Sequence, residues 1–163
     1  LKLIFLLKGK AVVITGAAGL LGRQHADAVA SFGGSPILLD LDNESLIDQA
    51  TELTNKYAVD AMSYVVDITN EQEIEQNCKD ILERYGKIDA LVNNAANNPK
   101  FDDQSGNEFS RLENFPMENW TADLAVGLTG AFLCAKHYGT AISNNPLGRE
   151  VTYATAIFLY RLE

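Results

Sequence analysis

The sequence predicts an α/β fold whose parallel sheet is doubly wound, with helices on both faces. Two observations lead to this prediction: short apolar strands alternate with segments of helical periodicity, and glycines mark the turns between them. Such short connections imply right-handed crossovers between parallel strands. The chain has 163 residues and 47% hydrophobic content, enough for one ordinary core, so we expect residues 1–163 to form a single domain.

Four buried strands are expected in the first part of the chain. Each is a short run of apolar or β-branched residues bounded by glycine or polar turn residues. The predicted strands are residues 11–15, 36–40, 62–66 and 90–92. A fifth strand is expected within residues 151–160, a segment rich in β-branched and aromatic residues.

Each of the first three strands leads into a predicted helix. The first helix covers residues 20–32 and stops at Gly33, and the second follows a strand that ends in a carboxylate. The third is expected to open with a capping box, because Thr69 and Gln72 have the required spacing. This alternation of strand and helix is what a doubly wound sheet requires.

Residues 97–114 are polar and are predicted to form a loop, after which Pro116 begins a long helix that extends to about Ser143. The apolar positions of this helix are interpreted as one stripe, which belongs either to the core or to an interface between subunits. The stripe consists of Trp120, Leu124, Leu128, Ala131, Phe132, Ala135, Tyr138 and Ile142.

Composition argues against several functions. The formal net charge of −9 disfavours nucleic acid as a partner, because a surface that binds phosphates needs a net basic face. The apolar run at residues 3–7 is too short for a signal core or a membrane span, so no membrane partner is expected.

Cysteines and histidines carry no metal-ligand spacing, and we expect no metal site. Cys78 and Cys134 fall inside helical patterns and are predicted to be buried, reduced thiols, which suits a cytoplasmic location. His25 and His137 are interpreted as surface or packing residues.

The first strand runs into a glycine turn that opens the first helix, and this turn is the main functional signal. Gly16 permits a tight turn, Gly19 lets a pyrophosphate approach the backbone, and Gly22 allows the helix to pack closely on the strand. The helix N-terminus, which includes Leu21, offers N–H groups and a partial positive charge to an anion. The alternative is a tight turn that binds no ligand.

A carboxylate at the end of the second strand favours NAD over NADP as the ligand. Asp40 is placed to accept hydrogen bonds from the adenosine ribose, and the same charge repels a 2′-phosphate. The alternatives are that Asp40 caps a helix or ends a solvated strand, and that Asp42 takes the ribose instead. Arg23 is the residue that would serve a 2′-phosphate, but its place inside the helix makes this the weaker case.

Three segments together resemble the short-chain dehydrogenase/reductase family: TGAAGLLG after the first strand, VVDIT after the third and LVNNAA after the fourth. The resemblance covers residues 8 to about 145 and implies a Rossmann-type sheet. It also implies that Asp67, with Ile68 beside it, bonds the adenine amino group and that Asn94, Ala95 and Ala96 lie against the nicotinamide-side ribose. Helix capping is a compatible second role for Asp67.

Within this family the glycine spacing also occurs in the nucleotide-sugar epimerase branch, whereas the segment from Val92 to Ala95 is typical of the single-domain branch. The turn, the long loop and the following helix are together similar to oxidoreductases associated with flagellin or surface-glycan modification. The resemblance further implies that Asn93 stabilises the sheet.

The resemblance implies a catalytic serine, asparagine, tyrosine and lysine, which this sequence matches only in part. Thr155 falls at the serine position and Gly127 at the asparagine position. Neither Tyr153 nor Tyr160 has a lysine four residues later. The tyrosine–lysine pair is therefore absent, and the fold is expected to be incomplete at its C-terminal side through truncation, a frameshift or natural loss.

Three functions follow from these observations. The first is NAD-dependent hydride transfer between the nicotinamide cofactor and a small alcohol or carbonyl substrate, with a sugar among the candidates. The second is an inactive NAD-binding module that lacks the tyrosine–lysine pair. The third is a methyltransferase, which the threonine before Gly16 and the segment NNAA disfavour. Open apolar faces would make a homo-oligomer plausible.

Overall fold

The computed structural model describes residues 7–97, 112–145 and 153–155. Its centre is a parallel sheet of five strands in the order β3-β2-β1-β4-β5. The strands are β1 (Ala11–Thr15), β2 (Ser35–Asp40), β3 (Met62–Val65), β4 (Ala90–Asn93) and β5 (Tyr153–Thr155). The α/β fold with a parallel sheet is thereby confirmed, and the predicted fifth strand is present as β5.

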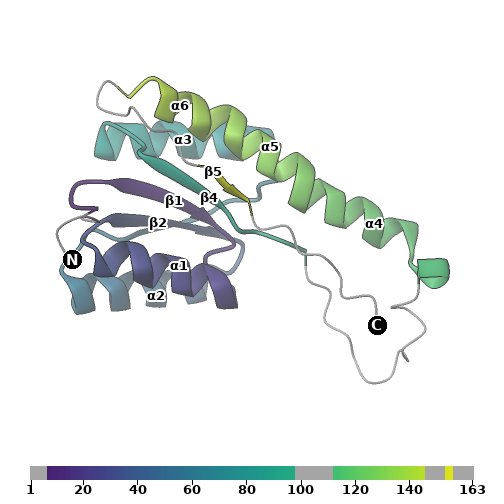
Figure 1. The fold of residues 1–163 in the computed structure, drawn as a ribbon, viewed down its shortest axis with the longest axis horizontal. Helices are drawn as coiled ribbons and strands as arrows, with labels where there is room; N and C mark the ends of the chain where they lie inside the picture. The colour runs from purple at the N-terminus through teal and green to yellow at the C-terminus, as the bar shows by residue number, and fades with distance from the viewer. Residues whose placement is uncertain (1–6, 98–111, 146–152, 156–163) are drawn as a thin grey trace.

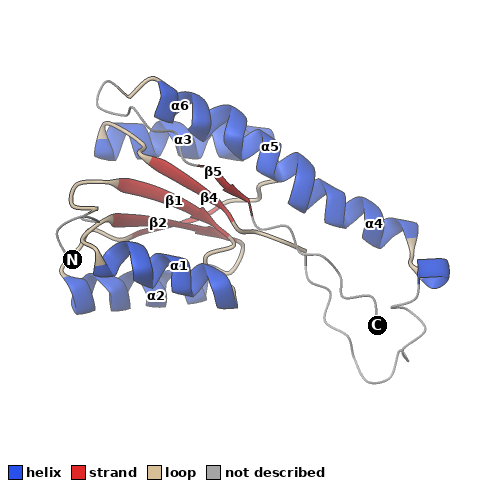
Figure 2. Ribbon diagram, in the orientation of Figure 1, coloured by secondary structure: helices blue, strands red, loops and turns tan. Residues whose placement is uncertain are grey.

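Helices cover both faces of this sheet (Figures 1 and 2). One face carries α1 (Leu20–Ser31) and α2 (Asn43–Tyr57), and the other carries α3 (Glu71–Tyr85) and the long helical segment that follows η2 (Leu112–Asn114). The alternating side chains of β1 divide the core accordingly. Val13 joins the cluster under α3, whereas Val12 and Ile14 join the cluster under α1 and α2.

The long helix is continuous from residue 117 to residue 143, and we call it the 117–143 helix. It combines α-helical and π-helical segments, with helical backbone angles at every junction. The segments are α4 (Met117–Leu124), η3 (Ala125–Gly130), α5 (Ala131–Cys134), η4 (Ala135–Gly139) and α6 (Thr140–Ser143). Both π-helical segments lie inside the long helix that was predicted here, and the apolar pattern of the sequence did not indicate them.

The predicted apolar stripe of this helix is divided between two environments. Tyr138 and Ile142 are fully buried over the sheet, whereas Trp120, Leu128 and Phe132 are exposed. The reason is visible in Figure 1: α6 and α5 lie over the sheet, but α4 extends past the carboxyl ends of the strands. Only the C-terminal half of the stripe is therefore core.

One local prediction is wrong, because α3 does not begin with a Thr69–Gln72 capping box. Its N-cap is Asn70, whose side-chain oxygen accepts from the Gln72 N–H at 3.1 Å. Thr69 instead donates its backbone N–H and its hydroxyl to Asp67, at 2.8 and 2.7 Å. The two cap candidates are adjacent, and the carboxylate before them decides which one is used.

No helix within the described residues is long and apolar enough to cross a membrane. The same residues contain no group of three or more histidine, cysteine or acidic side chains arranged to hold a metal ion.

Candidate functional site

The predicted site residues gather at the carboxyl edge of the sheet, because all five strands are parallel and end on the same side. The glycine turn follows β1, Asp40 ends β2 and Asn94 follows β4. The chain leaves β1 toward β2 on one side, while β4 lies on its other side, so the strand order reverses at β1. Crevices at such a reversal are the usual ligand sites of open α/β sheets.

Two glycines of the turn are required by its geometry. Gly16 has φ +63°, and an added Cβ would lie 2.7 Å from the Ala95 Cα. At Gly22 an added Cβ would overlap the Gly16 carbonyl oxygen, so α1 packs directly against the turn. These two constraints agree with the roles predicted for Gly16 and Gly22.

The third glycine is less constrained. An added Cβ at Gly19 would meet only the Gly16 oxygen, at 3.3 Å, and its backbone angles are ordinary. Gly19 is the N-cap of α1, and the first turn of that helix contains no acidic residue. The next two residues are both exposed, Leu20 at 83% and Leu21 at 45%. The positive end of the α1 dipole is therefore exposed beside the glycine turn.

Thr15 joins the turn to the end of β4, a role that the sequence did not predict. Its hydroxyl oxygen accepts from the N–H groups of Asn94 and Ala95, at 3.0 and 3.1 Å. The Asn94 side-chain nitrogen donates to the carbonyl oxygens of Thr15 and Gly16, each at 3.0 Å. A hydroxyl residue at the end of a buried strand was the only signal in the sequence. These bonds fix the spacing between the turn and the segment 94–96.

Asn93 and Asn94 connect β4 to different parts of the structure. The Asn93 side chain donates to the Ala131 carbonyl oxygen at 3.4 Å and so ties β4 to the 117–143 helix. Asn94 links the two central strands. Both residues are buried, and each side-chain oxygen is without a hydrogen-bond partner among the described residues.

Asp40 lies against the glycine turn, and Asp42 does not. One Asp40 carboxylate oxygen accepts from the Ala18 N–H at 2.9 Å and the other from the Leu41 N–H at 2.7 Å. Asp42 is the N-cap of α2 and accepts from the Ser45 N–H at 3.1 Å. Bonds from Ser45, and to a smaller extent the charge of Arg23, lower the pKa of Asp42. The residue that caps the helix after β2 is therefore Asp42 and not Asp40.

Arg23 is turned back onto the same turn. Its Nε donates to the Ala18 carbonyl oxygen at 3.0 Å, so Ala18 is bonded on both sides, by Arg23 and by Asp40. The guanidinium is therefore partly used in bracing the turn, although its charge lies near the end of β2.

Asp67 and Ile68 form the edge of the site after β3. The Asp67 N–H donates to Glu73 at 2.8 Å, and one of its carboxylate oxygens accepts twice from Thr69. Ile68 is 7% exposed and belongs to the core cluster under α3. The Val66 N–H donates to the Asp40 carbonyl oxygen at 3.1 Å, which connects this edge to the end of β2.

The expected catalytic positions are less fully placed. Thr155 ends β5 and pairs with Asn93 in the parallel register, so its backbone reaches the same edge of the sheet. Gly127 is exposed in η3, and an added Cβ there would meet nothing within 4 Å. Tyr160 lies outside the described residues.

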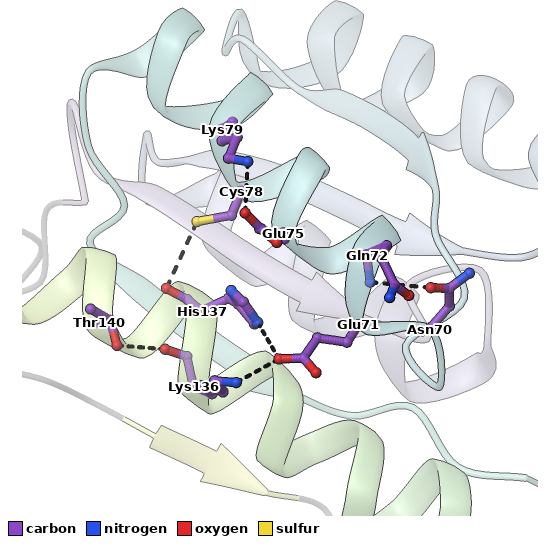
Figure 3. Close-up of polar contacts among 9 residues, drawn as sticks. All are labelled: Asn70, Glu71, Gln72, Glu75, Cys78, Lys79, Lys136, His137 and Thr140. Atoms are coloured by element: carbon purple, nitrogen blue, oxygen red, sulfur yellow. Dashed lines mark hydrogen bonds and ion pairs between the residues drawn. The ribbon is translucent and has the colours of Figure 1, made fainter.

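Cys78 and Cys134 belong to the core cluster under α3, and His137 contacts the first residue of that helix. Burial raises the pKa of Cys78 to about 11 and that of Cys134 to about 12, so both thiols are protonated at neutral pH. His137 bonds Glu71 at 3.0 Å, and the two side chains point toward each other (Figure 3). Their predicted packing roles agree with these positions.

Comparison with known proteins gives a consistent result. A family model described as short chain dehydrogenase matches residues 10–155. NADP-dependent mannitol dehydrogenase from Alternaria alternata is 28% identical over 154 residues, which are 93% of this chain and 54% of that protein. Momilactone A synthase from Oryza sativa subsp. japonica is 33% identical over 150 residues, which are 91% of this chain and 51% of that protein.

Solved structures agree with this match. The crystal structure of NAD+-bound xylitol dehydrogenase is 28% identical, with a TM-score of 0.78 over 90% of this chain and 53% of that chain. The chain therefore spans about half the length of the proteins that it resembles.

Proposed function

The chain belongs to the short-chain dehydrogenase family, and we propose that it supplies the cofactor-binding part of an NAD-dependent oxidoreductase acting on a small alcohol or carbonyl substrate. Two relatives are named for sugar alcohols, mannitol and xylitol. This favours a polyol or sugar over other alcohols. A link to flagellin or surface-glycan modification stays a prediction.

The observation that carries this proposal is the Asp40 carboxylate held 2.9 Å from the Ala18 N–H of the glycine turn. A dinucleotide whose pyrophosphate lies at the α1 N-terminus brings its adenosine ribose to this point. The carboxylate accepts from ribose hydroxyls and repels a 2′-phosphate. NAD is therefore the proposed cofactor, although the relatives include both NAD and NADP proteins.

The remaining contacts are proposed from their places around the turn. The pyrophosphate lies against the backbone at Gly19, whose own N–H donates to the Gly16 carbonyl oxygen at 3.2 Å, and it takes the N–H groups of Leu21 and Gly22. Asp67 with Ile68 takes the adenine. The segment Asn94, Ala95 and Ala96 is proposed to lie against the nicotinamide-side ribose.

Nicotinamide, when bound, supplies or accepts the hydride. The chain's own contribution is to bind the dinucleotide, to orient it by the Thr15–Asn94 connection and to place Thr155 at the same sheet edge. Thr155 is proposed to orient the substrate oxygen. Gly127 offers no side chain for proton transfer, and residues 1–163 contain no tyrosine with a lysine four positions later.

Asp40→Ala tests the cofactor assignment. We expect the substitution to weaken NADH binding by about 1–3 kcal/mol, the scale of hydrogen bonds to a charged group, and to narrow the preference for NADH over NADPH. Isothermal titration measures both. Asp42→Asn is the matched control, because asparagine keeps the α2 cap while removing a nearby charge. An unchanged NADH dissociation constant for Asp40→Ala refutes the ribose assignment.

The alternative function is an NAD-binding module without activity. NADH titration followed by an assay with a carbonyl substrate separates the two functions. Binding without turnover supports the module, and turnover supports the enzyme. Saturable binding of S-adenosylmethionine in place of NADH would instead support a methyltransferase.

The exposed half of the apolar stripe supports a further element of the proposal, a second copy of this chain as partner. Trp120, Leu124, Leu128 and Phe132 present roughly 500 Å² of apolar surface, so a symmetric pair buries about 1,000 Å². We propose, in addition, that residues 1–163 act as one domain in the cytoplasm, where free cysteines such as Cys78 and Cys134 persist.

A further inference from the structure

Two glycines of the same π-helical segment, η3, lie in opposite surroundings. An added Cβ at Gly127 would meet nothing within 4 Å. An added Cβ at Gly130 would lie 2.8 Å from Ile68 Cδ1, 2.9 Å from its Cγ1 and 3.1 Å from its carbonyl oxygen. Carbon atoms in ordinary contact are about 3.5–4.0 Å apart. The 117–143 helix thus rests on Ile68 at Gly130, a position where it has no side chain.

Ile68 has little freedom to yield. It is 7% exposed and packed in the core cluster under α3. Its neighbour Asp67 is held by Glu73 at 2.8 Å and by two bonds from Thr69. These bonds hold residues 67–69 together. The Val66 N–H, directly before them, donates to the Asp40 carbonyl oxygen at 3.1 Å and so connects this segment to Asp40.

The helix has little freedom to retreat either. Figure 3 shows Lys136 and His137 converging on one carboxylate oxygen of Glu71, at 2.6 and 3.0 Å. At the next residue, the buried Tyr138 hydroxyl donates to Asn77 at 2.9 Å. Directly after Gly130, the Ala131 carbonyl oxygen accepts from the Asn93 side chain at 3.4 Å. A group added at Gly130 is therefore pressed against Ile68 from a fixed support.

We propose that Gly130 is a positioning residue for the adenosine end of the dinucleotide. Because Gly130 has no side chain, the helix can contact Ile68 directly, and this contact sets the distance of Asp67 and Ile68 from Asp40. That distance has to fit one adenosine, whose adenine lies at Asp67 and Ile68 and whose ribose lies at Asp40. The inference rests on the proposed function, because it takes the adenine and ribose contacts from there. It adds a residue that touches no part of the ligand.

The test compares Gly130→Ala with Gly127→Ala, using ADP-ribose as the probe because it carries the adenosine and pyrophosphate without nicotinamide. We expect the dissociation constant of ADP-ribose to rise about tenfold in Gly130→Ala, the equivalent of one lost charged hydrogen bond. Gly127→Ala should bind like the unmodified chain. Both substitutions replace glycine with alanine in the same helical segment, so they share any general effect on helix propensity.

The variants Ile68→Ala and Gly130→Ala/Ile68→Ala separate positioning from general damage. Alanine lacks both the Cδ1 and the Cγ1 atom, which lie 2.8 and 2.9 Å from the added Cβ. Because Ile68 is itself a proposed adenine contact, the double variant is compared with Ile68→Ala, and the two should have similar dissociation constants for ADP-ribose. This comparison also keeps the test decisive if Gly130→Ala alone does not fold. If Gly130→Ala weakens binding as much in the Ile68→Ala variant as in the unmodified chain, the inference is overturned.

The outcomes distinguish this inference from the proposed function. If the unmodified chain does not bind ADP-ribose, the proposed function fails and the inference fails with it. If the unmodified chain binds but Gly130→Ala and Gly127→Ala have equal dissociation constants, only the positioning role of Gly130 is overturned.

Discussion

Asp89 holds together the edge of the sheet opposite the candidate site. Its carboxylate accepts from the Ala11 N–H at 2.9 Å and pairs with Lys10 and Lys87, each at 2.9 Å. Asn145, just past α6, donates to it at 3.3 Å. The Asp89 side chain is only 5% exposed. One carboxylate thus joins β1, the start of β4 and the end of the 117–143 helix.

We expect Asp89→Ala to lower the free energy of unfolding by about 3 kcal/mol, at the low end for a broken buried ion pair. The Ala11 N–H is buried and loses its acceptor, which alone costs about 1–3 kcal/mol. The side chains of Lys10 and Lys87 are 40% and 27% exposed, so both turn to solvent and limit the loss. Asp89→Asn keeps an acceptor for Ala11 and should cost about 1–2 kcal/mol.

Urea denaturation followed by circular dichroism measures these losses, and Asp60→Ala serves as the control. Asp60 pairs with Arg84 at 2.9 Å in an exposed position, and such pairs contribute about 0–1 kcal/mol. If Asp89→Ala costs no more than Asp60→Ala, the reasoning from burial is refuted.

The pH dependence of the Asp89 contribution has a definite sign. Burial is the largest influence on the Asp89 pKa and raises it, but the Ala11 N–H, Lys87 and Lys10 together outweigh burial and leave the pKa below 3.8. The folded pKa is therefore lower than the unfolded one, so the stabilisation is present above about pH 4 and is lost as the pH falls through the folded value. The difference between the unmodified chain and Asp89→Ala should accordingly shrink below about pH 4.

Two further predictions concern the site and the exposed stripe. Gly16→Ala should cost about 1–3 kcal/mol of stability and abolish NADH binding, because φ +63° and the Ala95 backbone exclude a side chain, whereas Gly19→Ala should cost less; equal losses in denaturation would contradict this. Leu128→Glu, which places a charge in the exposed half of the apolar stripe, should convert a dimer to a monomer in sedimentation velocity, whereas Thr129→Glu should leave the dimer intact. If the unmodified chain sediments as a monomer, a second copy of this chain is ruled out as the partner.

Most of the fold was predictable from the sequence, because each strand is a β-branched or apolar run closed by a turn residue. Four of the predicted strands agree with the structure within one or two residues at each end. The glycine turn was equally readable, since Gly16 and Gly22 are demanded by local backbone geometry. Signals confined to a few neighbouring residues were therefore sufficient for these elements.

The division of the apolar stripe was not predictable in the same way. Residues 120–142 show one helical pattern of apolar positions, and nothing local distinguishes Trp120 from Tyr138. What distinguishes them is where the sheet ends, because strands only four or five residues long cannot lie under the whole of a 117–143 helix. Burial of a helix face depends on the length of its neighbours, which periodicity does not contain.

The residues that sequence reasoning missed share a physical property: they contact other parts of the protein and not the proposed ligand. Thr15 bonds the N–H groups of Asn94 and Ala95, and Gly130 admits the backbone and side chain of Ile68. Such roles require no particular spacing from the glycine turn, so no motif reports them. They nevertheless determine whether Asp40, Asp67 and Asn94 stand at distances that fit one dinucleotide, because a hydrogen bond weakens steeply outside a narrow range of distance and angle. Affinity in this site is therefore expected to depend on the supports as strongly as on the contacting residues.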